Sequence, residues 1–143
     1  GLMALGGILI AGPASDLIGN KIPLAFTFLM RLLSFLIILN YQTTVSFYIF
    51  SLTFGFTYLV TGTLIPTTLG RLYGFLHIGL LSGFVTTAHH LGGGFWAYMG
   101  GYIFDRTGSY RLAFILSAIM ALIALFCCML IVEKKHSPRE RGF

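Results

Sequence analysis

The chain has 143 residues, of which 57% are hydrophobic and 9% charged, and its mean hydropathy is +0.90. An ordinary soluble domain is about one quarter charged, so this composition excludes a water-soluble monomer and indicates a membrane protein. The formal net charge of +5 does not call for a nucleic-acid partner, because basic residues at the ends of membrane spans are ordinary topology signals.

Five apolar runs alternate with short polar connections, which predicts an all-α, polytopic membrane bundle of about five transmembrane helices. A helix that crosses a bilayer needs about 20 mostly apolar residues. The first run is only roughly 18 Å of helix, so we expect it to be the end of a truncated helix. One transmembrane domain covers residues 1–132, with spans near 1–12, 22–39, 46–69, 78–104 and 112–132, and a polar tail follows at 133–143.

A polar hairpin is predicted between the first two runs, over residues 12–21. Its glycines allow the chain to reverse tightly where a side chain would collide with a neighbouring helix. Asp16 is then free to reach across the end of the bundle, toward Arg71 or toward the start of the span near Ile78, where a helix N-terminus favours a carboxylate. The spacing Gly-x3-Asp-x2-Gly-x-Lys is formed by Gly12, Asp16, Gly19 and Lys21.

Arg31 lies about nine residues into the second run, roughly 14 Å from the start of that helix and close to the middle of the bilayer. A guanidinium at this depth is costly unless it faces a cavity or a partner. It is able to bind a carboxylate through paired hydrogen bonds, which favours an anionic substrate. Two alternatives remain open: Arg31 extends to the cytoplasmic interface, or it bonds to another helix in a purely structural role.

His89 and His90 lie midway along the fourth run. Neighbouring residues on a helix point about 100° apart, so we expect no more than one of them to face a central pathway squarely. Histidine titrates near neutral pH, which suits substrate binding or proton coupling. Hydrogen bonding between helices is the alternative.

Small residues recur every four positions further along the same run, at Gly93, Ala97 and Gly101. This spacing places them on one helix face and lets a partner backbone approach closely. We therefore predict that this face is buried against another helix. It serves tight packing alone, or it also allows helices to slide during a functional cycle.

Basic residues are distributed unequally between the two sides of the predicted bundle. Alternating spans place Arg106 and Arg111 on one side, and Lys21, Arg71 and the basic residues of the tail on the other. Because Lys and Arg accumulate in cytoplasmic segments, we predict that the hairpin and the C-terminal tail are cytoplasmic.

No cofactor or metal site is predicted, because the histidines and the adjacent Cys127 and Cys128 follow no familiar ligand spacing. The spans contain no paired aspartates and no His-Glu-x-x-His sequence, and no serine–histidine arrangement can be assigned. An intramembrane enzyme is therefore disfavoured.

Three stretches resemble the major facilitator superfamily of transporters. In the hairpin, four residues match the loop signature of that family, while Leu17 and Asn20 stand where the signature usually has basic residues, as in a second-half copy. The other two stretches are similar to the monocarboxylate and oxalate/formate-type branches. They are Leu72-Tyr73-Gly74 with Gly79 and Gly83, and residues 92–94, 100–105 and 107–110 with Phe114.

The resemblance implies the C-terminal part of a twelve-helix transporter, from the end of the eighth helix to the twelfth, whose N-terminal half lies elsewhere in the protein. It implies secondary active transport by alternating access, with a monocarboxylate or similar organic anion as substrate and protons as a possible second partner. Arg31, His89 and His90 are then the substrate-binding candidates, and the membrane is the plasma membrane. A non-transporting helical subunit or scaffold is the alternative function.

Overall fold

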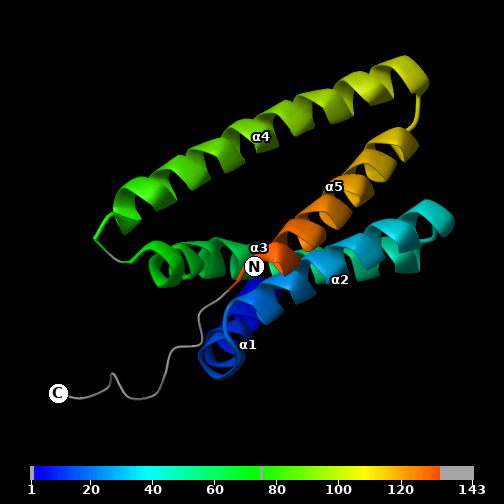
Figure 1. The fold of residues 1–143 in the computed structure, drawn as a ribbon. Helices are drawn as coiled ribbons and strands as arrows, with labels where there is room; N and C mark the ends of the chain where they lie inside the picture. Colours follow the sequence, from blue (N-terminus) through cyan, green and yellow to red (C-terminus); the bar gives the residue numbers. More distant parts are fainter. Residues whose placement is uncertain (1, 75, 133–143) are drawn as a thin grey trace.

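The computed structural model describes residues 2–74 and 76–132, which form five helices and no strand. This confirms the all-helical bundle predicted from the sequence. The predicted tail, residues 133–143, lies outside the described residues. The helices are α1 (Leu2–Ile18), α2 (Lys21–Asn40), α3 (Thr44–Tyr73), α4 (Ile78–Thr107) and α5 (Arg111–Leu130) (Figure 1).

Three of these helices, α2, α3 and α5, are long and apolar enough to cross a membrane. The described part of α1 is apolar but shorter than a full span. α4 has 30 residues and is therefore long enough, but its glycines, histidines and hydroxyl side chains lower its hydropathy. A helix of this kind needs protein or water along its polar side, because lipid cannot form hydrogen bonds with it.

The first helix continues further than the sequence predicted. Instead of ending at Gly12, α1 runs through Pro13 to Ile18, so Gly12 lies in the helix and not in a turn. Proline is tolerated inside a membrane helix when neighbouring groups or water satisfy the carbonyl that it leaves free. Two residues further on, the hydroxyl of Ser15 donates to the carbonyl oxygen of Gly12 at 2.7 Å. The reversal itself takes only two residues. Gly19 adopts a φ of 84°, which glycine accepts without strain, and Asn20 follows it.

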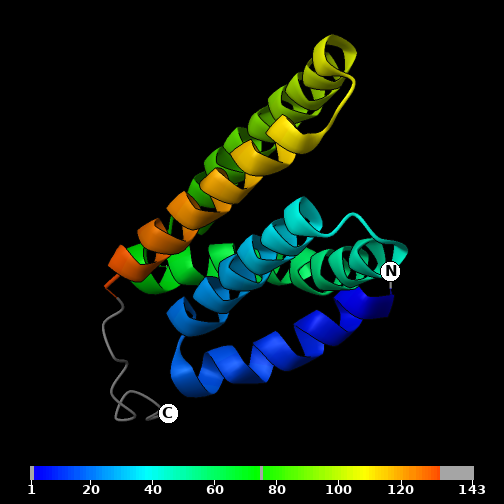
Figure 2. The same ribbon diagram turned by 90° about the vertical axis from the view of Figure 1, so that its right-hand side faces the viewer.

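The helices are packed unequally. α2 packs extensively against α5 on one side and α3 on the other, while α1 packs mainly against α3. α4 contacts only α3 and α5, and Ile103 is its only buried residue among those described. Figures 1 and 2 show α4 connecting the far end of α3 to the start of α5 and lying at the outside of the bundle. α4 therefore borders the interior without being enclosed by it.

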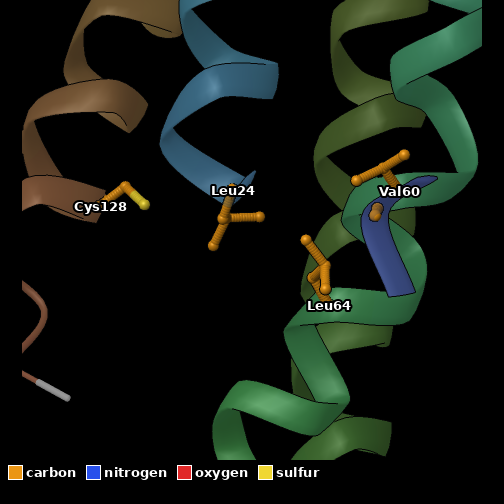
Figure 3. Packing of buried hydrophobic residues seen from close by; sticks show 5 residues of the cluster. Leu24, Val60, Leu64 and Cys128 are labelled. Atoms are coloured by element: carbon orange, nitrogen blue, oxygen red, sulfur yellow. The ribbon is translucent and has the colours of Figure 1, made fainter. Parts of the chain in front are cut away.

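Two apolar clusters hold the packed helices together. Figure 3 shows the first, in which Leu24 of α2 lies between Cys128 of α5 and the side chains of Val60 and Leu64 on α3. The second is aromatic and lies further along α2. There the ring of Phe35 lies 5.5 Å from the rings of both Phe50 and Phe54, measured between centroids. Such edge and tilted contacts add stabilisation beyond the burial of the rings.

Small residues of α1 allow a close approach to the backbone of α3. Gly7 and Ala11 are buried toward α3, and a Cβ added at Gly7 would collide with the carbonyl oxygen of Phe56. Gly7, Ala11 and Ser15 are spaced four residues apart, which is the pattern of small residues that allows close helix contacts in membranes.

The face predicted to be buried, on α4, is exposed. Gly93, Ala97 and Gly101 are all exposed, and a Cβ built at Gly93 or Gly101 meets no atom within 4 Å. α4 lies at the outside of the bundle, where the described helices offer no backbone to cover that face. Burial of this face against another helix therefore stays a prediction.

We predict that Gly7→Ala destabilises the protein by about 1–3 kcal/mol, because α1 must move away from the backbone of α3. The thermal unfolding midpoint of the purified protein in detergent measures this effect. Gly12→Ala is the matched control, since an added Cβ there meets nothing within 4 Å. Equal losses for the two variants would contradict the close contact at Gly7.

Candidate functional site

Arg31 is bound by three hydrogen bonds from α2 to α3. Its Nε donates to the hydroxyl of Thr57 at 3.1 Å, and its Nη2 donates to the carbonyl oxygen of Thr57 at 3.0 Å and to the hydroxyl of Thr61 at 3.2 Å. Thr57 is fully buried, and its hydroxyl in turn donates to the carbonyl oxygen of Thr53 at 2.9 Å. These bonds fix the orientation of the guanidinium through the edge that carries Nε and Nη2.

Aromatic rings enclose the same guanidinium. Its carbon Cζ lies 5.4 Å from the ring centroid of Phe54 and 5.9 Å from that of Phe28. At these distances the faces of aromatic rings attract a cation, more strongly where water is excluded. The rings and the threonines together keep Arg31 inside the bundle, as expected for a charge that is to act there and not at the membrane surface.

Arg31 has no carboxylate partner in the part of the chain that the structure describes. That part contains two acidic residues, Asp16 and Asp105, and the only ion pair recorded in it joins Asp16 to Arg71. The Nη1 group of Arg31 makes no hydrogen bond within residues 2–74 and 76–132. An arginine inside a membrane span usually pairs with an acid or faces a polar cavity. Because no described acid lies beside Arg31, we expect a cavity there.

A cavity of about 440 Å³ lies beside Arg31, between α2, α3, α4 and α5. We call it the Arg31 cavity. Its wall is mostly apolar, with Phe28, Phe35, Phe54 and Trp96 among the lining residues, and its polar side chains include Arg31, His89 and Ser117. A mainly apolar wall with a few polar groups is typical of sites for small molecules, and the volume is in their usual range. The only charged side chain in this wall is Arg31.

The two histidines of α4 have different surroundings. His89 lines the Arg31 cavity and also a second cavity between α3 and α4, whereas His90 lines only the second. Both are exposed, and their ring centroids are 5.6 Å apart. His89 is thus the histidine that the structure brings to the same cavity as Arg31.

The turn between α1 and α2 is bonded to the end of α3. The side chain of Asn20 is fully buried, and its Nδ2 donates to the hydroxyls of Thr67 at 2.9 Å and Thr68 at 3.2 Å. A basic side chain at this position would bury a charge next to neutral hydroxyls, which is costly. The departure from the usual loop signature at Asn20 therefore suits the packing of this turn.

Arg71 contacts the same turn from α3. Its Nη1 donates to the carbonyl oxygen of Ser15 at 3.2 Å, and its Nη2 lies 3.6 Å from Oδ1 of Asp16. Arg71 is one of the two partners that the sequence suggested for Asp16. Their side chains are 37% and 79% exposed, so this ion pair is open to water and weak.

The other residues of the hairpin signature lie at separate places. Gly12 lies inside α1, with open space around its Cβ position, and Gly19 supplies the positive φ of the turn. Lys21 begins α2, and its carbonyl oxygen accepts a hydrogen bond from Sγ of Cys128 at 3.6 Å. The signature therefore covers the end of α1 with Gly12 and Asp16, the turn with Gly19, and the start of α2 with Lys21.

Sequence reasoning missed the threonines that bind Arg31. Thr53, Thr57 and Thr61 are spaced four residues apart, which places their hydroxyls on one face of α3. That spacing was a usable signal, because a row of hydroxyls within an apolar run predicts a polar partner across the helix interface. The described residues include no group of three or more His, Cys, Asp or Glu side chains able to hold a metal ion.

These features define a polytopic helical membrane protein with a cationic group beside an open cavity between its helices. The sequence matches the family described as Major Facilitator Superfamily over residues 1–143, and the chain belongs to that family. Members of the family are transporters, so this is an integral membrane transporter. Neither a search of curated proteins nor a search of solved structures found a match.

We predict that Asn20→Ala lowers the free energy of unfolding by about 1–3 kcal/mol, because it removes a fully buried amide that donates to Thr67 and to the buried Thr68. Thermal unfolding in detergent measures the loss. Asn40→Ala is the matched control: Asn40 is exposed at the other end of α2, and its amide donates only to the carbonyl oxygen of Leu36. A loss at Asn20 no larger than at Asn40 would contradict the role of the buried amide.

Proposed function

We propose that this protein carries a small organic anion, with a monocarboxylate favoured, by secondary active transport and alternating access. The single observation that carries the proposal is Arg31, a cation within a membrane span that lacks an acidic partner among the described residues and borders a cavity of about 440 Å³. The resemblance to the monocarboxylate and oxalate/formate-type branches supports the same substrate class.

The hydrogen bonds of Arg31 leave a defined part of the guanidinium for a ligand. A guanidinium has five N–H groups, and the bonds to α3 use the one on Nε and those on Nη2. The two on Nη1 remain for a carboxylate. Charge-assisted hydrogen bonds of this kind are about twice as strong as neutral ones. His89 borders the same cavity, and in the proposal it assists binding or exchanges a proton with the pathway.

The proposed transport cycle needs more of the protein than this chain. Substrate sites of transporters built from repeats lie between the repeated units near the middle of the membrane. In the proposal these residues are the C-terminal part, and an N-terminal half completes the site. The end of the bundle with Lys21 and Arg71 faces the cytoplasm, as does the C-terminal tail, and the membrane is the plasma membrane.

Arg31→Gln in the intact transporter is expected to reduce anion uptake by about tenfold or more, because it removes one charge-assisted contact with the substrate. Uptake of a labelled monocarboxylate, normalised to the amount of protein at the membrane, measures the effect. Arg31→Lys keeps the charge and is expected to retain part of the activity. Arg111→Gln, at the start of α5, controls for the loss of a positive charge. Wild-type affinity in Arg31→Gln would remove Arg31 from the site.

The contact between Asp16 and Arg71 is proposed to hold the cytoplasmic side closed in one state of the cycle. Both groups are partly in water, so the pair contributes only about 0.2–1 kcal/mol. A contribution of this size suits a contact that must form and break in each cycle. The buried Asn20 keeps the turn in place next to it, since its bonds to Thr67 and Thr68 are independent of Asp16.

Asp16→Asn is expected to shift the balance between inward-open and outward-open states by about two- to fivefold toward the inward-open state. The rate at which a thiol reagent modifies a single cysteine introduced into the pathway reports this balance. Asp105→Asn, at the opposite end of the bundle, is the control. Exchanging the two charges, with Asp16→Arg and Arg71→Asp together, is expected to restore the balance. An unchanged labelling rate in Asp16→Asn would refute the role of the pair.

A further inference from the structure

A second cavity, of about 270 Å³, lies between α3 and α4, and we call it the α3–α4 cavity. Facing stripes of the two helices line it, with residues 58 to 66 on α3 and residues 82 to 90 on α4. Its wall differs from that of the Arg31 cavity because it is rich in neutral hydrogen-bonding groups. These are Tyr58, Thr61, Ser82, Thr86, His89 and His90.

Most of these groups are unused inside the described part of the chain. The hydroxyl oxygen of Ser82 is buried and has no hydrogen-bond partner there. The side chains of Tyr58, Thr86, His89 and His90 likewise make no hydrogen bond within it. Thr87, next to Thr86 but outside the cavity, instead donates to the carbonyl oxygen of Gly83 at 2.9 Å. Tyr58, Thr86, His89 and His90 are exposed, so the buried oxygen of Ser82 is the group of this set for which a missing partner is costly. A polar atom in the cavity would supply that partner, and the exposed groups are open to the same ligand.

The α3–α4 cavity is adjacent to the groups that hold Arg31. His89 lines both cavities. Thr61 lines the α3–α4 cavity and also accepts a hydrogen bond from Nη2 of Arg31. The two cavities therefore meet at Thr61 and His89, and Thr86 follows about one helical turn away on α4. These three groups are the ones nearest to a ligand whose charged end is at Arg31.

We propose that the α3–α4 cavity binds hydroxyl groups of the transported anion, so that the favoured substrates are hydroxylated monocarboxylates. The inference rests on the proposed transport of organic anions. It adds that the protein selects anions by their hydroxyl groups. The lining contains both donors and acceptors, as a hydroxyl group requires. It contains no Lys or Arg, so a second carboxylate would lack a cation, and dicarboxylates are disfavoured.

The test compares uptake of glycerate, propionate and malonate by the intact transporter. Glycerate and propionate both have three carbons and one carboxylate and differ in two hydroxyl groups, while malonate has a second carboxylate. The wild type is expected to prefer glycerate over propionate by about tenfold in kcat/KM, and to take up malonate poorly. Thr86→Val is expected to reduce the preference about three- to tenfold, and Ser82→Ala, about two helical turns from His89, is expected to reduce it by less. In both variants uptake of glycerate falls more than uptake of propionate.

Thr87→Val is the matched control, because it makes the same change one residue away from Thr86 and outside the cavity. Equal uptake of glycerate and propionate by the wild type, or an unaltered preference in both cavity variants, would overturn the inference and leave anion transport standing. A loss of preference in Thr87→Val as large as in Thr86→Val would also overturn it. Failure of the wild type to take up any of the three anions would instead refute the proposed function on which the inference rests.

Discussion

The arrangement of the site depends on one contact, the bonding of Arg31 to Thr57 and Thr61. A membrane offers no water to an arginine at this depth, so a neighbouring helix must supply the acceptors. α3 does so with two hydroxyls and a carbonyl, and this fixes α2 and α3 at the level where Phe54 meets the guanidinium. The same bonds determine which edge of the guanidinium is left for the cavity. Structural bonding and ligand binding are therefore compatible roles for Arg31, because they use different N–H groups.

The polar residues of α4 are explained by the two cavities that this helix lines. It is too polar to qualify as a span by hydropathy, yet it borders both the Arg31 cavity and the α3–α4 cavity. Ser82, Thr86 and His89 lie on the side that faces α3. Lipid offers no hydrogen bonds to these polar side chains, whereas water or a ligand in a cavity does. Among the described helices, α4 has the lightest packing, and its contacts are with α3 and α5 alone.

The sequence was sufficient for those features that local chemistry determines. Hydropathy gave five helices, the depth of Arg31 marked it as the internal cation, and Asp16 was matched with Arg71 as one of two partners. Features that depend on neighbouring helices were not predicted. Equal spacing of small residues occurs in α1 and α4, but only at Gly7 does another backbone lie close enough to need it. Glycine and proline at positions 12 and 13 suggested a turn, whereas this segment continues α1 to Ile18.

The central claim is that the positive charge of Arg31 is balanced by a transported anion. Experimental structures of the intact transporter with and without glycerate test it most directly. The account predicts a carboxylate of the bound anion next to Nη1 of Arg31, with Nε and Nη2 still bonded to Thr57 and Thr61. An aspartate or glutamate from another part of the protein, within about 4 Å of the guanidinium in both structures, would contradict it.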